Sequence, residues 1–125
     1  MNMIRYSNTL KFSYKVLKPF ELHRFYVDGI FSGNQLDKSH GYIHLCGNLI
    51  QVKNTIHKFY QFETVKILQF PNHKLINLKF EQNKPGGEFY PHLYSKLSIE
   101  DIDKIYSIDF DDNNINDYYR KLNLL

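Results

Sequence analysis

The sequence predicts one small α+β domain with two or three short helices. The 125 residues are enough for one hydrophobic core and too few for two ordinary domains. Short stretches that alternate apolar and polar residues, as strands do, are interspersed with short stretches of helical periodicity. No internal repeat and no linker divides the chain, so residues 1–125 are expected to form a single domain.

A strand and a helix are the first predicted elements. Residues 12–17 alternate in hydrophobicity and predict a strand. Pro19 suits the first turn of a helix, and the helix predicted for residues 20–27 ends at Gly29. Residues 31–41 are expected to be a loop.

The middle of the chain predicts a strand, a helix and a further strand. Residues 42–46 alternate and form the second predicted strand. Asn48 can cap the helix that follows, whose apolar residues recur at helical spacing: Leu49, Val52, Ile56 and Phe59. Residues 64–70 are apolar on both faces, which is typical of a central strand.

The last third of the chain predicts several short elements. Residues 78–81 and 89–94 are expected to be extended, with residues 84–87 as a turn or mobile loop between them. Ser98 begins a predicted capped turn, and residues 104–110 form the last predicted strand.

Charge is distributed unevenly along the chain. Residues 1–99 carry 13 Lys and Arg against 6 acidic residues, a net charge of +7, whereas residues 100–125 carry 3 against 7, a net charge of −4. The acidic extension, residues 111–125, is expected to be a short helix or a loose tail and can recruit a protein partner. A basic body can attract phosphate-bearing ligands, but lysines without a dense cluster are more typical of a solubilising surface than of nucleic-acid binding.

Composition excludes several classes of protein. Hydrophobic residues make up 42% and charged residues 23%, the balance of soluble globular proteins. No apolar run approaches the ~18 residues of a membrane span, and residues 1–10 hold no apolar stretch long enough for a signal peptide. The single cysteine, Cys46, excludes an internal disulfide framework and a multi-cysteine zinc site. We therefore expect an intracellular, cytoplasmic protein without membrane contact.

Two predicted strands carry the same pattern of histidine and tyrosine. Each places apolar residues on one face and polar aromatic residues on the other: Tyr42, His44 and Cys46 in the first, and Tyr90, His92 and Tyr94 in the second. If the two strands lie near each other, they make a cleft lined by two imidazoles and several phenols. Such a set suits proton transfer near neutral pH, or hydrogen bonding to sugar hydroxyls and phosphates. The alternative is that His44 and His92 are core histidines with backbone partners.

Three other kinds of chemistry fit the residues less well. A two-histidine phosphoesterase would need Ser or Thr two residues after each histidine, where this chain has Cys46 and Tyr94. A metal site would use His40, His44, His92 and Glu81, but residues 40 and 44 would lie ~13 Å apart along one strand, so a turn at Gly41 would be needed to bring both to one ion. Cys46 as a nucleophile would need a stabilised thiolate, and most lone cysteines are inert.

Three groups of residues resemble the uncharacterised family called domain of unknown function 952. They occur in the family's order and spacing: Tyr14-Lys-Val, then Phe31-Ser-Gly…Asp37…Gly41-Tyr-Ile-His-Leu, then Leu78-Lys-Phe-Glu81…Gly87…Phe89-Tyr-Pro-His-Leu-Tyr94. The resemblance covers roughly residues 12–109, and its most specific parts are the two histidine strands.

This resemblance implies a fold similar to that of ADP-ribosyltransferases, with a split, curved β core and small helices. Within that superfamily the chain looks closest to the RNA 2′-phosphotransferase branch. The implied cofactor is NAD, and by this analogy His44 would contact the nicotinamide-side ribose or a phosphate. No metal is expected, and the candidate catalytic residues are His44 and His92, as the strand pattern indicates. The implied ligand-binding residues are Tyr14, Lys15, Tyr42, Cys46, Glu81, Tyr90 and Tyr94.

Departures from the family pattern weaken the inference of NAD-dependent transfer. Cys46 stands where the family usually has serine. Tyr14 and Lys15 stand where ADP-ribosyltransferases carry histidine or arginine. Three hypotheses therefore stay open: a transferase-like enzyme acting on NAD, a nucleotide or an RNA 2′-phosphate; a non-catalytic module that binds nucleotides or ADP-ribose; and a structural or protein-interaction domain.

Overall fold

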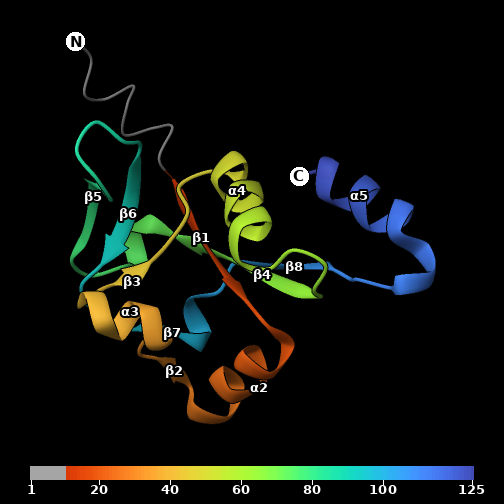
Figure 1. The fold of residues 1–125 in the computed structure, drawn as a ribbon. Helices are drawn as coiled ribbons and strands as arrows, with labels where there is room; N and C mark the ends of the chain where they lie inside the picture. The colour runs from red at the N-terminus through yellow and green to blue at the C-terminus, as the bar shows by residue number, and fades with distance from the viewer. Residues whose placement is uncertain (1–10) are drawn as a thin grey trace.

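A computed structural model describes residues 11–125 of the chain, and within them lie eight short strands and four helices (Figure 1). The strands are β1 (Phe12–Leu17), β2 (Ile30–Phe31), β3 (Ile43–His44), β4 (Val65–Pro71), β5 (Leu78–Gln82), β6 (Phe89–Leu93), β7 (Leu97–Ser98) and β8 (Lys104–Ile108). The helices are α2 (Pro19–Asp28), α3 (Gln35–His40), α4 (Leu49–Phe59) and α5 (Ile115–Asn123). The expectation that no signal peptide begins the chain concerns residues that lie outside the described range. No helix within residues 11–125 has the length and hydropathy that a membrane crossing requires.

The β core is split into three antiparallel sheets, in agreement with the predicted α+β class. One sheet has the order β1-β4-β8, a second has the order β3-β6-β5, and the third pairs β2 with β7. Tyr14 and Cys46 join the first two sheets, because each backbone N–H donates to the other residue's carbonyl at 2.8 Å. This bridge places Cys46, two residues after the end of β3, beside Tyr14 of β1 at the edge of the main sheet.

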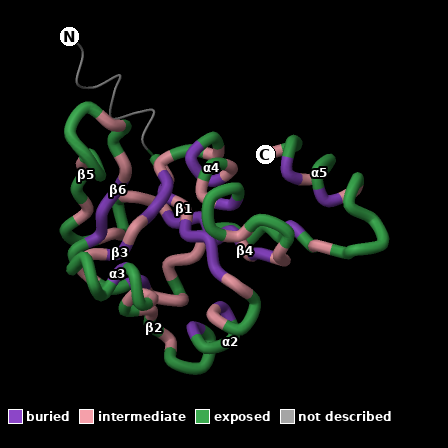
Figure 2. Tube along the Cα trace, viewed as in Figure 1, coloured by how far each residue is buried: buried purple, intermediate pink, exposed green. Residues whose placement is uncertain are grey.

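The central strand β4 separates two hydrophobic clusters, as the apolar faces of residues 64–70 predict. Ile67 belongs to a cluster formed with α4 and α5, and Leu68 belongs to a cluster formed with α2, β3, β6 and β7. Both side chains are fully buried, and the buried segments of Figure 2 meet along β1 and β4. The two clusters hold the three sheets together although few backbone hydrogen bonds join them.

Two of the helices form where the sequence predicts them. Helix α2 begins at Pro19 and ends at Gly29, which adopts the left-handed conformation (φ +77°) with its N–H donating to the carbonyl of Phe25. Helix α4 begins after Asn48, whose side chain accepts a hydrogen bond from Gln51 N–H. Local caps therefore set the ends of both helices.

The prediction of a loop over residues 31–41 is wrong, because the segment contains α3. Asn34 and Asp37 make a capping box: the Asn34 side chain accepts from Asp37 N–H, and the Asp37 carboxylate accepts from Asn34 N–H, both at 2.9 Å. Gly41 ends the helix in the left-handed conformation (φ +83°). The only buried residue of α3 is Asp37, so the helix has none of the apolar periodicity on which the prediction relied.

The acidic extension is folded, in agreement with the helical alternative. A 3₁₀ turn (Asp112–Asn114) leads into α5, which lies beyond β8 (Figure 1). Tyr118 and Leu122 of α5 are buried in the cluster that α4 also contacts. The extension is therefore part of the hydrophobic core rather than a loose tail.

Candidate functional site

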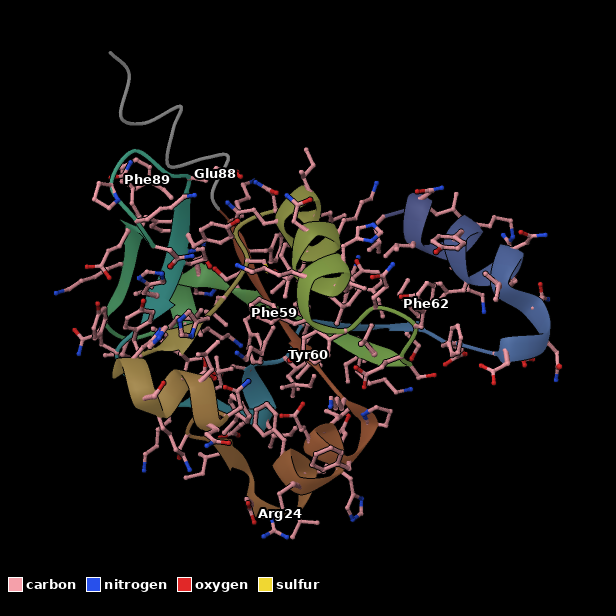
Figure 3. All side chains as sticks on the ribbon, in the orientation of Figure 1. Arg24, Phe59, Tyr60, Phe62, Glu88 and Phe89 are labelled. Carbon is pink, nitrogen blue, oxygen red and sulfur yellow. The ribbon has the colours of Figure 1, made fainter. Side chains whose placement is uncertain are left out.

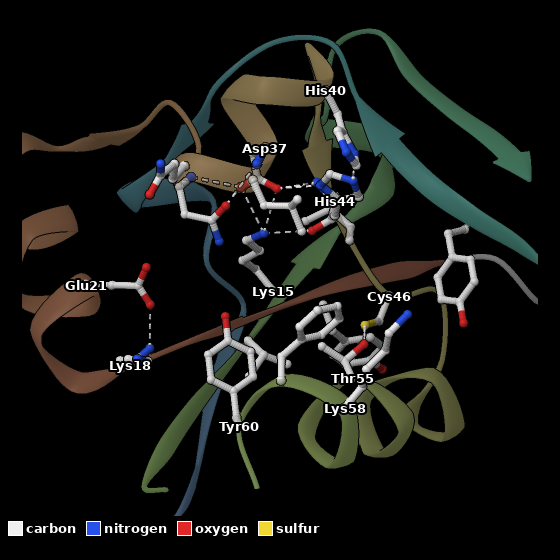
Figure 4. A pocket seen from close by; sticks show the side chains of 18 of the residues that line it. Lys15, Lys18, Glu21, Asp37, His40, His44, Cys46, Thr55, Lys58 and Tyr60 are labelled. Atoms are coloured by element: carbon white, nitrogen blue, oxygen red, sulfur yellow. Dashed lines mark hydrogen bonds and ion pairs between the residues drawn. The ribbon is translucent and has the colours of Figure 1, made fainter. Parts of the chain in front are cut away.

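A cleft of about 630 Å³ opens between helices α2, α3 and α4 and strands β1 and β3 (Figure 4). Its lining is mixed: Lys15 of β1, Asp37 of α3 and His44 of β3 face Phe20 of α2 and Phe59 of α4. Figure 3 shows Phe59 and Tyr60 at the end of α4, on the side that faces α2 and α3. A partly apolar cleft of this size with a few convergent polar groups is typical of a site for a small molecule.

Asp37 is the central charged group of the cleft. Its side chain is buried, with 2% of its surface exposed. The ammonium of Lys15 lies 3.0 and 3.3 Å from the two carboxylate oxygens, and it also donates to the carbonyl of His44 at 2.9 Å. Lys15 therefore joins β1 to α3 and β3, and the Asp37 carboxylate neutralises the charge of its ammonium.

His44 is held in one orientation by the same carboxylate. Its backbone N–H donates to Asp37 Oδ1 at 3.0 Å, and its ring Nδ1 lies 2.7 Å from that oxygen. Burial alone would raise the pKa of Asp37, but the hydrogen bonds from His44 and Asn34 and the charge of Lys15 outweigh burial and lower the pKa to about 2. The ionised carboxylate can only accept, so Nδ1 of His44 carries a proton and Nε2 points away from Asp37.

Nε2 of His44 meets a second imidazole at the cleft. It lies 2.9 Å from Nδ1 of His40, the last residue of α3. The chain turns at Gly41, which is the turn that brings residues 40 and 44 together instead of ~13 Å apart along one strand. Within residues 11–125 no group of three or more His, Cys, Asp or Glu side chains is arranged to hold a metal ion.

Tyr42 forms an aromatic layer over the second histidine strand. Its ring stacks on His92 with the centroids 4.0 Å apart and the planes inclined by 22°. His92 is directly opposite His44 in the β3–β6 pair, so the two histidine strands are neighbours, as the cleft hypothesis requires. The His92 ring is buried beneath Tyr42, however, and does not line the cleft.

Both ring nitrogens of His92 have side-chain partners. Nδ1 lies 2.9 Å from Glu81 Oε1, and Nε2 lies 2.8 Å from Asn83 Oδ1. Tyr94 Oη donates to the same Glu81 oxygen at 2.5 Å. These hydrogen bonds from Tyr94 and His92 lower the pKa of Glu81, while burial lowers the pKa of His92. His92 is thus satisfied by side chains rather than by the backbone partners of the alternative interpretation.

The phenols and the thiol near the cleft stay protonated at neutral pH. Burial, followed by neighbouring negative charges, raises the pKa of Tyr42 and of Tyr90. The hydrogen bond to Glu81 raises the pKa of Tyr94 to about 12. Burial also raises the pKa of Cys46, whose Sγ lies 3.3 Å from Thr55 Oγ1. A thiolate nucleophile at Cys46 is therefore not favoured.

The structure gathers most, but not all, of the sequence-predicted site residues around the cleft. Six of them line it: Tyr14, Lys15, Tyr42, His44, Cys46 and Tyr90. Three lie behind the ring of Tyr42: Glu81, His92 and Tyr94. Sequence reasoning missed the role of Asp37, and it placed His40 near His44 only on condition of a turn at Gly41. The signal that could have found both is the Asn34–Asp37 capping box with a glycine after His40, which together indicate a short helix.

Gly33 is expected to be essential for this arrangement. It has φ +115°, and a Cβ there would lie 2.8 Å from Cβ of Asp37. Gly33→Ala should therefore lower the free energy of unfolding by about 3 kcal/mol, through backbone strain and displacement of Asp37. Urea unfolding measures this, with Gly29→Ala as the matched control. Gly29 also has positive φ but nothing within 4 Å of a Cβ, so its substitution should cost about 1 kcal/mol. Equal losses in the two variants would show that Gly33 is not a close contact of Asp37.

Known proteins match the chain in sequence and in fold. A family model described as "Protein of unknown function (DUF952)" matches residues 17–105. The crystal structure of protein CC0527 from Caulobacter crescentus has a TM-score of 0.72 and 28% sequence identity, and the match covers 81% of this chain and 89% of that one. The solution NMR structure of CC0527 has a TM-score of 0.69 at 28% identity, covering 82% and 88%. No curated protein sequence matches the chain.

Proposed function

We propose that this chain, which belongs to the DUF952 family of proteins of unknown function, binds a phosphate-bearing ribose ligand in the cleft and contacts a ribose hydroxyl through His44. The ligand class comprises NAD, ADP-ribose and an RNA 2′-phosphate end. The observation that carries the proposal is the 2.7 Å contact between Asp37 and His44 Nδ1. It fixes a ring whose other nitrogen is presented to the cleft.

The chemistry of this pair suits a general base. With Nδ1 protonated and bonded to Asp37, Nε2 of a neutral His44 can accept the proton of a ribose hydroxyl. The carboxylate would then stabilise the imidazolium that forms. In the absence of ligand, Nε2 is occupied by His40, which is exposed and can turn aside for a hydroxyl group. A transferase-like reaction at the ribose is the reaction class that such a base supports.

The rest of the cleft supplies the other contacts that such a ligand needs. Lys18 and Lys58 line the cleft, and their ammonium groups are accessible to solvent. The ammonium of Lys18 lies 3.4 Å from Glu63 Oε1 in an exposed ion pair. Tyr42 and Phe59 offer rings to a planar base. The donor set therefore fits a dinucleotide in composition, with phosphates near the lysines and a ribose near His44.

Lys15 does not fit the role of a phosphate ligand. Its ammonium is buried and is already shared between Asp37 and the carbonyl of His44. A phosphate would have to compete with a carboxylate that is itself buried. We therefore assign the phosphate contact to Lys18 and Lys58, and a positional role to Lys15. In the same way, His92 acts on the ligand only through Tyr42, the ring that it supports.

A thermal-shift series tests the proposal. The wild-type chain is heated with NAD, ADP-ribose or a 2′-phosphorylated oligoribonucleotide. A ligand at 100 times its dissociation constant should stabilise the fold by ~2.7 kcal/mol, on the order of ten degrees for a domain of this size. His44→Asn should remove the shift, because an asparagine amide can still donate to Asp37 but presents nothing at the position of Nε2. His57→Asn, an exposed site on α4, is the matched control and should keep it.

The outcomes separate the open hypotheses. A shift without turnover of the ligand would leave a non-catalytic binding module. No shift with any ligand would overturn the proposal and direct attention to a protein partner at the acidic extension, where Asp111 and Asp112 are exposed. The cytoplasmic location belongs to the same proposal, and its support is the single cysteine, Cys46, which has no partner in the chain for a disulfide.

A further inference from the structure

Two imidazole rings meet at the mouth of the cleft. Nδ1 of His40 and Nε2 of His44 are 2.9 Å apart, and both residues line the cleft. We infer that His40 and His44 together chelate one divalent transition-metal ion of the kind that prefers imidazole ligands. This inference goes beyond the proposed function, since it concerns a second class of ligand, which would bind Nε2 of His44 in place of a ribose hydroxyl.

The first supporting observation is the partner on the far side of His44. Metal-binding histidines usually donate their other ring N–H to a carboxylate, which fixes the tautomer and makes the ligating nitrogen more basic. Asp37 has this role for His44, with 2.7 Å between Oδ1 and Nδ1. The carboxylate is itself held by Lys15 and by Asn34 N–H, so the orientation of the His44 ring is fixed by the fold.

The second observation is the distance between the two nitrogens. Imidazole nitrogens lie ~2.0–2.1 Å from such ions, so two of them at 90° about one ion are ~2.8–3.0 Å apart, whereas tetrahedral ligands are ~3.3 Å apart. The observed 2.9 Å is also the length of an ordinary hydrogen bond between the rings, and it shows that a small rotation of His40 is enough to bring both nitrogens to one ion. Imidazole ligands suit Cu²⁺, Ni²⁺ and Zn²⁺, and Cu²⁺ binds most strongly of the three.

The third observation is that an ion can reach both imidazole rings and that one of the rings is free to rotate. His44 is on a strand with its ring 24% exposed, whereas His40 is exposed at the C-terminal end of α3. One nitrogen is thus fixed and the other can rotate until both lone pairs face the same ion. An ion entering the cleft replaces the proton that the two rings share in its absence.

The composition of the site limits which ions it takes. The described residues provide two imidazoles and no third His, Cys, Asp or Glu in ligating position, so water or a bound anion fills the other positions. Two neutral nitrogen ligands are poor ligands for Mg²⁺ and Ca²⁺, which require oxygen. The turn at Gly41 that a metal site at residues 40 and 44 requires is present, since Gly41 ends α3 in the left-handed conformation.

Isothermal titration of the tag-free, chelator-treated full chain with Cu²⁺, Ni²⁺ and Mg²⁺ tests the inference. One equivalent of Cu²⁺ or Ni²⁺ should bind, and Mg²⁺ should not. His40→Asn should weaken binding at least tenfold, and its thermal unfolding should match that of the wild type because residue 40 is exposed. His57→Asn is the matched control and should bind like the wild type.

A spectroscopic readout makes the result independent of heat changes. Cu²⁺ coordinated by two nitrogens of the chain should give a visible absorption band that His40→Asn removes and His57→Asn retains. Binding that survives His40→Asn, or no binding to the wild type, would overturn the inference. The nucleotide series is run in EDTA, so that loss of metal binding and loss of nucleotide binding are observed separately.

Discussion

Asp37→Asn is expected to lower the free energy of unfolding by about 3–5 kcal/mol, the usual result of removing one partner of a buried ion pair. The substitution leaves the ammonium of Lys15 buried at 6% exposure without a counter-charge. It also weakens the hydrogen bonds that hold His44 and the first turn of α3. Urea unfolding followed by circular dichroism measures the loss.

A double variant shows whether the buried charge causes this loss. Asp37→Asn combined with Lys15→Met removes both charges and leaves no uncompensated ion. The double variant should be more stable than Asp37→Asn alone, because replacing a buried ion pair by neutral groups is often tolerated. Additive losses from the two substitutions would contradict a coupled pair.

The pH dependence of the wild type follows from the same carboxylate. The pKa of Asp37 is lowered from 3.8 to about 2 in the folded chain. A lowered folded-state pKa stabilises the fold above the unfolded-state value, and this stabilisation is lost as the pH falls through the folded-state value. Asp37 should thus contribute about 2 kcal/mol at neutral pH, and this contribution should disappear between pH 4 and pH 2. The acid unfolding curve of Asp37→Asn should lack this component.

Tyr118→Ala should have a comparable effect at the other end of the molecule. The side chain is 1% exposed and lies in the cluster of α4, β4 and α5. Truncating a buried large aromatic residue usually costs about 3–5 kcal/mol, since it removes apolar contacts and leaves a cavity. Chemical unfolding of the full chain measures the change.

Two neighbouring substitutions serve as controls for Tyr118→Ala. Tyr118→Phe keeps the ring and loses the phenol oxygen that accepts from Phe62 N–H at 3.2 Å, so it should cost about 1 kcal/mol. Tyr119→Ala changes a residue that is 37% exposed, and its effect should be well below that of Tyr118→Ala. If Tyr118→Ala were no worse than Tyr119→Ala, α5 would not be part of the cooperative core.

Much of the fold could be predicted from local patterns. The strand of residues 12–17, the proline and glycine at the ends of α2, and the doubly apolar strand of residues 64–70 each depend on nearby residues. The extent of the second strand was less predictable. Regular pairing is limited to Ile43–His44, because the chain leaves β6 after the hydrogen bond from Leu45 N–H to the carbonyl of Pro91 and forms its bridge with β1 at Cys46.

The site was only partly predictable, because its decisive contacts join distant segments. The alternation of Tyr42 and His44 indicated the correct face of β3. Nothing in that alternation indicated that Lys15 would reach Asp37 across 22 positions of the sequence. His92 looked equivalent to His44 by pattern, yet strand pairing places one ring at the cleft and the other under Tyr42.

Helix α3 differs from the other helices in the kind of interaction that holds it against the rest of the protein. Its one buried side chain is a carboxylate, whereas α2, α4 and α5 bury apolar residues. Apolar attachment weakens on cooling and carries a large heat-capacity change, but an ion pair with hydrogen bonds exposes little apolar surface when it separates. The wall of the cleft and the core that supports it therefore respond differently to temperature. Separation of α3 from the rest of the protein should therefore carry a smaller heat-capacity change than separation of α2, α4 or α5.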